Sequence, residues 1–135
     1  MKPMSPIRCA CLVDTRGSKL LLVRVRQNEH WYLPGGKLEP HETAPSALRR
    51  EVAEELGIDL SPQSIRYLYS VVGPAYKHPG DVELICFSAQ LTGEPAAHGE
   101  ISEVQWLDYR DESKLAPAVK LLCRQYFQHA DAKSR

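Results

Sequence analysis

The residues from 36 to 58 constrain this chain more than any other stretch, because they join a glycine loop to a regular helical pattern. The helical part carries Glu51, Glu54 and Glu55, which lie within an arc of about 100° on one face of the helix. The adjoining arc is apolar and can pack into a core. It consists of Ala44, Leu48, Val52 and Leu56.

The three neighbouring carboxylates repel one another, at a cost of about 0.2–0.5 kcal/mol for each close pair. A cation beside the helix would offset this repulsion. Ligand sets made only of carboxylates suit a hard ion such as Mg²⁺ or Mn²⁺ rather than zinc. Taken alone, the pattern fits either a metal-binding face or a solvated helix face.

The spacing of the charged and glycine positions separates these two interpretations. It follows G-x5-E-x7-R-E-U-x-E-E-x-G-U, in which U is a bulky aliphatic residue, and it resembles the Nudix box of the Nudix (MutT-like) hydrolases. Every fixed position is filled. The charged and glycine positions are Gly36, Glu42, Arg50, Glu51, Glu54, Glu55 and Gly57.

One departure from the family lies inside the loop. Many members carry glycine immediately before the first glutamate of the box, whereas this chain carries His41. If the position requires a positive φ, histidine is among the more tolerant replacements.

The composition bounds the function classes. At 135 residues, the chain is expected to form one domain over residues 1–135. Lys plus Arg and Asp plus Glu both number 17, so no overall field draws the protein to a nucleic acid polymer or a membrane. No long apolar run suggests a secretory signal or a membrane span, and we expect a cytoplasmic protein. The four cysteines are expected to be small core residues.

The apolar periodicity predicts alternating strands and helices. Thr43 is expected to cap the box helix, Pro45 to lie in its first turn and Gly57 to end it. Pattern alone favours an α/β or α+β fold, and the resemblance implies the Nudix-type α/β/α sandwich with a mixed β-sheet. The predicted strands are 7–13, 19–26, 31–33, 65–72, 82–91 and 103–108, and the helices are 44–56 and 117–128.

The resemblance implies a role for each group near the box. Glu51, Glu54 and Glu55 would bind the metal, joined by the carbonyl of Gly35. Arg50 typically pairs with a glutamate of the box and orients it. The implied cofactor is Mg²⁺, for which Mn²⁺ can substitute.

Substrate contacts are predicted around the same loop. Arg24 lies in an apolar strand shortly before the glycines, where a charge needs a partner, and we predict a phosphate contact there. The alternative for Arg24 and Arg26 is a solvated strand end. Lys37 and Glu42 are expected to hold the loop or to face the phosphates.

The implied reaction is hydrolysis of a nucleoside diphosphate linked to another group X, with a nucleoside triphosphate or modified (d)NTP favoured by the short chain. Pro74 is typical of members that cleave ADP-ribose, whereas Tyr76 is typical of those that cleave dinucleoside polyphosphates. Because both are present, neither discriminates. A small-molecule nucleotide is the implied partner, and homodimers are common in the family.

Two non-hydrolytic alternatives share this fold. Regulators that bind nucleotides without turnover usually have an eroded box, and isomerases of prenyl diphosphates have an altered one, so the intact glutamates favour an enzyme. The loop 73–80 is long and polar, and we expect it to select the substrate through Tyr76. Four aromatic residues are candidates for base stacking, although core packing is the favoured interpretation for each: Tyr32, Tyr67, Tyr69 and Tyr76.

The general base is sought outside the box. Glutamates bound to cations are poor bases, so a carboxylate from another element is expected. The alternative is that a glutamate of the box, such as Glu54, serves as the base. Related enzymes often supply a carboxylate from the loop before the last strand. Here Glu100 follows a glycine in that loop and is our first candidate, with Glu103 at the start of the strand as the second.

Overall fold

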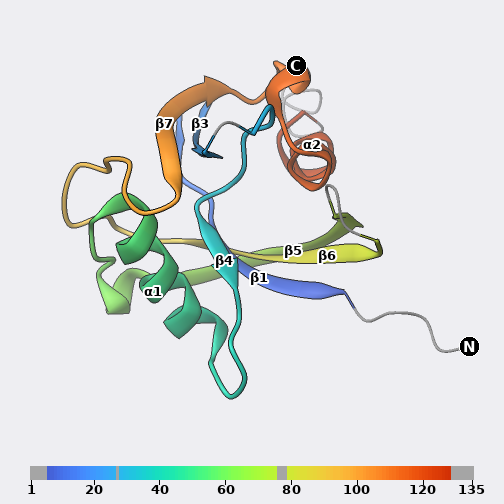
Figure 1. Ribbon diagram of the computed structural model, residues 1–135. Helices are drawn as coiled ribbons and strands as arrows, with labels where there is room; N and C mark the ends of the chain where they lie inside the picture. The colour runs from blue at the N-terminus through green and yellow to red at the C-terminus, as the bar shows by residue number, and fades with distance from the viewer. Residues whose placement is uncertain (1–5, 27, 76–78, 129–135) are drawn as a thin grey trace, which may run out of the picture.

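The computed structural model describes residues 6–26, 28–75 and 79–128 of the chain (Figure 1). Within these ranges, strands and helices alternate in an α/β arrangement. The strands are β1 (Ile7–Leu12), β2 (Thr15–Arg16), β3 (Lys19–Val25), β4 (Gly35–Lys37), β5 (Arg66–Pro74), β6 (Asp81–Ser88) and β7 (Ile101–Asp108). The helices are α1 (Ala44–Leu56) and α2 (Pro117–Cys123), with short helical turns at Pro62–Ser64, Glu112–Lys114 and Arg124–Gln128.

The strands form two sheets. One has four strands in the order β4-β1-β6-β5 and is mixed, because β1 and β6 run parallel while the other pairs are antiparallel. The other is antiparallel, in the order β2-β3-β7. In Figure 1, α1 and α2 lie on opposite sides of the four-stranded sheet. The predicted sandwich with a mixed sheet is therefore confirmed, and the separate three-stranded sheet was not predicted.

Each helix buries an apolar face against its own side of the sheet. Leu48, Val52 and Leu56 of α1 pack with Leu12 of β1 and Phe87 of β6 in one core cluster. The second cluster joins α2 to the other face of the sheet and includes Cys11, Leu84, Cys86, Val119 and Leu122.

The cysteines are free thiols within this architecture. Cys11, Cys86 and Cys123 are buried and Cys9 is half-buried, which agrees with their predicted role as small core residues. No helix in the described ranges is long and apolar enough to cross a membrane.

Several predicted boundaries were wrong. The segment 31–33 makes only isolated bridges, Val23 with Tyr32 and Trp31 with Leu115, and the strand lies instead at the glycine pair that begins β4. Glycine has low strand propensity, which hides β4 in the sequence. Strand β5 continues to Pro74, inside the predicted loop 73–80. The last helix changes to a π turn after Cys123.

The ends of α1 agree with the sequence. The Thr43 side chain accepts a hydrogen bond from the Ser46 amide at 3.3 Å, and a proline lies in the first turn. Gly57 adopts a left-handed conformation with φ of 69° and donates to the Ala53 carbonyl. These caps fix where the glutamate-bearing helix begins and ends.

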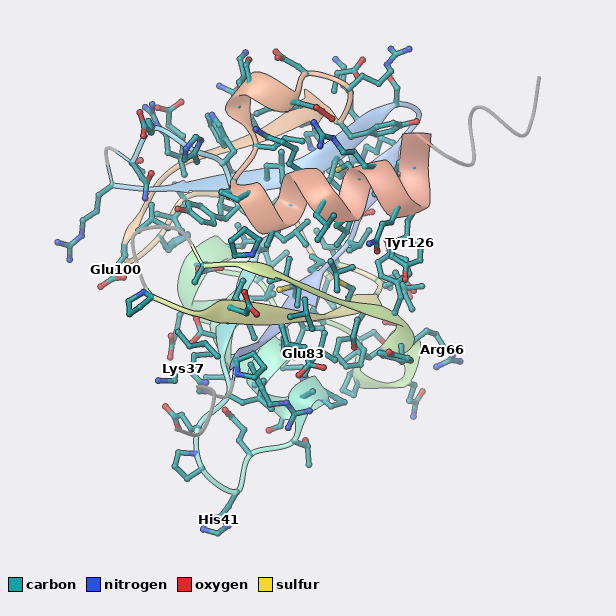
Figure 2. All side chains as sticks on the ribbon, turned by 90° about the vertical axis from the view of Figure 1, so that its right-hand side faces the viewer. Lys37, His41, Arg66, Glu83, Glu100 and Tyr126 are labelled. Atoms are coloured by element: carbon teal, nitrogen blue, oxygen red, sulfur yellow. The ribbon has the colours of Figure 1, made fainter. Side chains whose placement is uncertain are left out.

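The loop before α1 is tied to the helix by one arginine. Arg50 makes a bidentate contact with Glu42, with N···O distances of 2.8 and 2.9 Å, and also donates to the Lys37 carbonyl at 3.2 Å. Glu42 in turn accepts from the Glu39 amide at 2.9 Å. His41, at the tip of this loop in Figure 2, has φ of 66°, so the position does require the conformation that histidine tolerates.

Gly35 allows β4 to lie directly against β1. Its φ is 135°, and a Cβ atom there would lie 2.0 Å from the Ala10 carbonyl oxygen. A side chain at this position is therefore excluded both by conformation and by contact with the backbone.

We predict that Gly35→Ala lowers the free energy of unfolding by about 3–5 kcal/mol, because strain and overpacking add. Gly17→Ala is the matched control. Gly17 also has a positive φ, but a Cβ atom there would stand in open space, so the cost is about 1–2 kcal/mol. Chemical denaturation of both variants measures the two values, and equal losses would contradict the role assigned to the Ala10 contact.

We also predict a pH-dependent contribution from Glu42. Its hydrogen bonds with Arg50 and with the Glu39 amide lower its pKa from 4.5 to about 2. A depressed folded pKa stabilises the protein above the unfolded value, and this stabilisation is lost as the pH falls from about 4.5 toward 2. Glu42→Gln should therefore melt below wild type at pH 7, and the gap should close near pH 2. A gap independent of pH would refute the prediction.

Candidate active site

A pocket of about 450 Å³ opens where the four-stranded sheet, the end of β3 and the start of α2 meet. Its wall is largely apolar and includes Val23, Leu84 and Ala118. Glu55 reaches it from α1, beside Gly35 and Gly36. The pocket therefore joins an apolar chamber to the carboxylate face of the box helix.

Glu55 is the buried member of that face. It accepts a hydrogen bond of 2.8 Å from the Gly35 amide. Its pKa is raised from 4.5 to about 8, mainly by burial and in smaller part by the negative charges of Glu51, Glu54 and Glu100, while the hydrogen bond from the Gly35 amide lowers it. The site thus concentrates negative charge around a poorly solvated carboxyl group, which a cation would relieve.

Glu51 lies against the glycine loop. A Cβ atom on Gly36 would lie 2.4 Å from the Glu51 carboxyl carbon, so only glycine leaves room for the carboxylate. Arg50 donates to Glu51 at 2.8 Å, and it lies 3.7 Å from Glu54, whose side chain is 60% exposed. Arg50 therefore connects Glu42 of the loop to Glu51 and Glu54 of the helix face.

The carboxylates fit a hard divalent ion in their chemistry. They come from one helix face, bring only oxygen donors, and lie beside a glycine loop without side chains. In the described part of the chain, no three His, Cys, Asp or Glu side chains are arranged closely enough to hold a metal. Arg50 occupies part of the space between the carboxylates, and its contacts would have to rearrange for all three to bind one ion.

The loop between β6 and β7 brings Glu100 toward the box. Its backbone caps the end of α1, where the Ala96 amide donates to the Leu56 carbonyl at 3.1 Å and the His98 amide donates to the Glu55 backbone carbonyl at 2.9 Å. Glu100 follows directly and is close enough to raise the pKa of Glu55. Of the two predicted base candidates, Glu100 is thus the one whose charge affects the pKa of Glu55.

Arg26 holds Glu100 from the other side. The Arg26 amide donates to the Glu100 carbonyl at 2.9 Å, and the guanidinium lies 3.5 Å from the Glu100 carboxylate. Arg26 has φ of 52° at a bulge between β3 and β7, and the Ser102 hydroxyl donates to its carbonyl. This unusual backbone aims the Arg26 side chain at Glu100.

The remaining predicted site residues lie outside the described pocket lining or outside the described part of the chain. Glu103 pairs with Arg24 across β3 and β7, and the Arg24 guanidinium lies 5.6 Å from the Trp31 ring centroid. Neither Arg24 nor Glu103 is among the described residues that line the pocket. Lys37 is exposed and projects on the same side of the view as Glu100 in Figure 2. Tyr76 lies outside the described residues.

Sequence reasoning did not identify Asn28, which lines the pocket together with Tyr32. The side-chain amide nitrogen of Asn28 donates to the Tyr32 hydroxyl at 3.1 Å. An asparagine after a strand is an ordinary turn residue, so its spacing carried no signal of a site. Among the other aromatic candidates, Tyr67 packs edge-on against Phe87 and Tyr69 stacks on Tyr126.

Comparison with known proteins agrees with this architecture. The family model described as NUDIX domain matches residues 4–125. A MutT Nudix hydrolase structure from Burkholderia pseudomallei superimposes with a TM-score of 0.74 at 25% identity, covering 91% of this chain and 99% of that one.

Two curated relatives are much longer than this chain. The m7GpppN-mRNA hydrolase of Saccharomyces cerevisiae is 29% identical over 117 residues, which are 84% of this chain and 12% of the relative. The 8-oxo-dGDP phosphatase of Homo sapiens is 42% identical over 50 residues, which are 35% of this chain and 16% of the relative. Since the family match extends over nearly the whole chain and the fold is that of a solved Nudix hydrolase, this chain belongs to the Nudix hydrolase family.

Proposed function

We propose that this chain hydrolyses the diphosphate linkage of a nucleoside diphosphate linked to another group, with a nucleoside triphosphate or modified (d)NTP as its substrate and Mg²⁺ as its cofactor. The observation that carries this proposal is the junction of the carboxylate face with the apolar pocket at Glu55. A nucleoside can occupy the chamber while its phosphates reach the glutamates. The similarity of part of this chain to the 8-oxo-dGDP phosphatase of Homo sapiens supports a nucleotide as the substrate.

In this proposal, Glu51, Glu54 and Glu55 hold the metal, together with the Gly35 carbonyl. The bound ion supplies charge neutralisation at the phosphate oxygens and lowers the pKa of water. Arg50 orients Glu51 and keeps the loop on the helix through Glu42. The apolar wall limits the access of bulk water to the reacting linkage.

Glu100 is proposed as the general base that takes a proton from the attacking water. Its loop is fixed to the end of α1, and Arg26 faces its carboxylate at 3.5 Å. Glu103 is the second candidate, although its ion pair with Arg24 must open before it can act. The box residue Glu54, the most exposed of the three, remains the alternative if neither serves.

Contacts to the substrate are proposed at the rim. Lys37 offers an exposed cation on β4, next to the loop that Glu42 holds. Arg24 can reach a phosphate only if it exchanges Glu103 for the substrate. Tyr76 is proposed to influence substrate choice from the loop after β5, so Tyr76→Ala should alter KM or substrate ranking more than the metal requirement.

The metal requirement is the first prediction. We expect turnover with Mg²⁺ or Mn²⁺, none in excess EDTA, and no support from Zn²⁺. Glu54→Gln and Glu55→Gln should keep the fold and lower kcat by about two to four decades. Glu94→Gln is the control, because Glu94 is an exposed carboxylate outside the box helix, at the other end of the β6–β7 loop from Glu100. Full turnover in EDTA would exclude the proposed cofactor.

The reaction itself is tested with a panel of nucleoside triphosphates, 8-oxo-dGTP, ADP-ribose and dinucleoside polyphosphates. Release of pyrophosphate and a nucleoside monophosphate from a triphosphate would support the proposal. Cleavage of ADP-ribose or a dinucleoside polyphosphate alone would move the chain to an alternative substrate class. Nucleotide binding without turnover of any member would identify a regulator.

The base assignment is tested by the pH–rate profiles of Glu100→Gln and Glu103→Gln. We expect Glu100→Gln to lose the acidic limb of the profile and to lower kcat strongly, while Glu103→Gln keeps the limb. Circular dichroism of both variants controls for folding. If both retain the wild-type profile, the base lies in the box and the assignment to Glu100 is wrong.

A further inference from the structure

Polar side-chain groups are scarce in the described lining of the pocket. Besides Glu55 and the weakly polar thiols of Cys9 and Cys11, they come from Asn28 and Tyr32, which lie among apolar residues. A hydrogen-bonding pair in such a wall is well suited to recognise one edge of a ligand, because an unmatched polar group would be buried against it.

The backbone fixes both residues. The backbone amide and carbonyl of Tyr32 bond to Val23 at 2.9 and 2.8 Å, and the backbone amide of Asn28 donates to the Val25 carbonyl at 3.0 Å. The Tyr32 ring also packs against both core clusters. The pair is therefore held in place before any ligand arrives.

The orientation of the Asn28 side chain follows from its neighbours. The His30 amide donates to the Asn28 oxygen at 3.2 Å, which places the amide nitrogen on the side of Tyr32. One N–H of that nitrogen goes to the Tyr32 hydroxyl at 3.1 Å. Its second N–H has no partner within the described residues.

The Tyr32 hydroxyl is thereby used as an acceptor, and its own hydrogen is available as a donor. The pair thus offers two neighbouring donors, one from the Asn28 amide and one from the Tyr32 hydroxyl. A ligand edge with two adjacent acceptors forms hydrogen bonds with both donors at once. An edge that carries a donor instead places that donor against one of the protein donors, which then has no acceptor.

Among the common bases, two kinds present such an edge, the 6-oxopurines and cytosine, whose N3 and O2 atoms are both acceptors. The larger purine ring covers more of the apolar wall of the pocket, which favours the 6-oxopurines. Guanine presents its N7 and O6 acceptors side by side, and hypoxanthine has the same pair. Adenine replaces O6 by an amino group, which donates. The Watson–Crick edge of guanine has two donors beside O6, so the N7/O6 edge is the one that matches.

We propose that Asn28 and Tyr32 are specificity residues that select a 6-oxopurine base, which binds in the pocket through its N7 and O6 atoms. The inference rests on the proposed function for the placement of the nucleotide, with the phosphates toward Glu55. It narrows that function to guanine or hypoxanthine nucleotides. A base whose N7 carries hydrogen, as in 8-oxoguanine, has one acceptor fewer on this edge and is disfavoured.

The test is equilibrium binding of nucleoside monophosphates in EDTA, because these compounds have no anhydride linkage to cleave. The probes are GMP, IMP, AMP, CMP and 7-deaza-GMP, the last of which lacks the N7 acceptor. We expect GMP and IMP to bind about tenfold more tightly than AMP, with most of that gain lost for 7-deaza-GMP. Chemical shifts of the Asn28 side-chain amide should move with GMP.

The variants separate recognition from folding. Asn28→Asp replaces the donor by an acceptor of nearly the same size and should bring GMP and AMP to within about twofold of each other. Tyr32→Phe keeps the ring and removes the hydroxyl, and it should reduce the preference for GMP. Tyr67→Phe is the matched control, since Tyr67 lies outside the described pocket lining, and it should leave the preference unchanged.

Equal binding of GMP and AMP, binding of CMP as tight as that of GMP, tighter binding of 8-oxo-GMP than GMP, or no binding of any probe up to millimolar concentration would overturn the inference. So would a GMP preference that survives Asn28→Asp. These outcomes are independent of turnover. A chain that prefers GMP but cleaves no nucleotide would contradict the proposed function alone, and one that cleaves ATP and GTP equally well without a GMP preference would contradict this inference alone.

Discussion

The close approach of β4 to both β1 and α1 is the constraint on which the rest of the site depends. It is possible because Gly35 has no side chain to meet the Ala10 carbonyl and Gly36 has none to meet Glu51. The same approach lets the Gly35 amide reach the buried Glu55 carboxylate. One pair of glycines therefore sets the position of the sheet edge, the helix and two of the three carboxylates relative to one another.

Residues close together in the sequence gave the most reliable predictions. The caps of α1, its buried face and the conformation at His41 all follow from local rules, and the structure agrees with them. The strand β4 was missed because its glycines carry no strand pattern. The pairing of Arg24 with Glu103 was also missed, because it depends on the register between strands that lie far apart in the chain.

The pocket could not be predicted from the sequence for a similar reason. Its wall combines β1, β3, β6 and the start of α2, so no single stretch of sequence describes it. Asn28 becomes informative only when the His30 amide and the Tyr32 hydroxyl are seen to fix both ends of its side chain. Chemistry carried by one helix is thus readable from sequence, whereas recognition built from several elements requires the fold.

The cap that the loop before β7 places on α1 has a consequence for motion. The amides of Ala96 and His98 bond to the last turn of the same helix that bears Glu55, and Glu100 follows two residues later. Fraying of that turn would therefore loosen the backbone before Glu100 together with the end of the helix that bears Glu55. Hydrogen exchange at the Ala96 and His98 amides would report this opening.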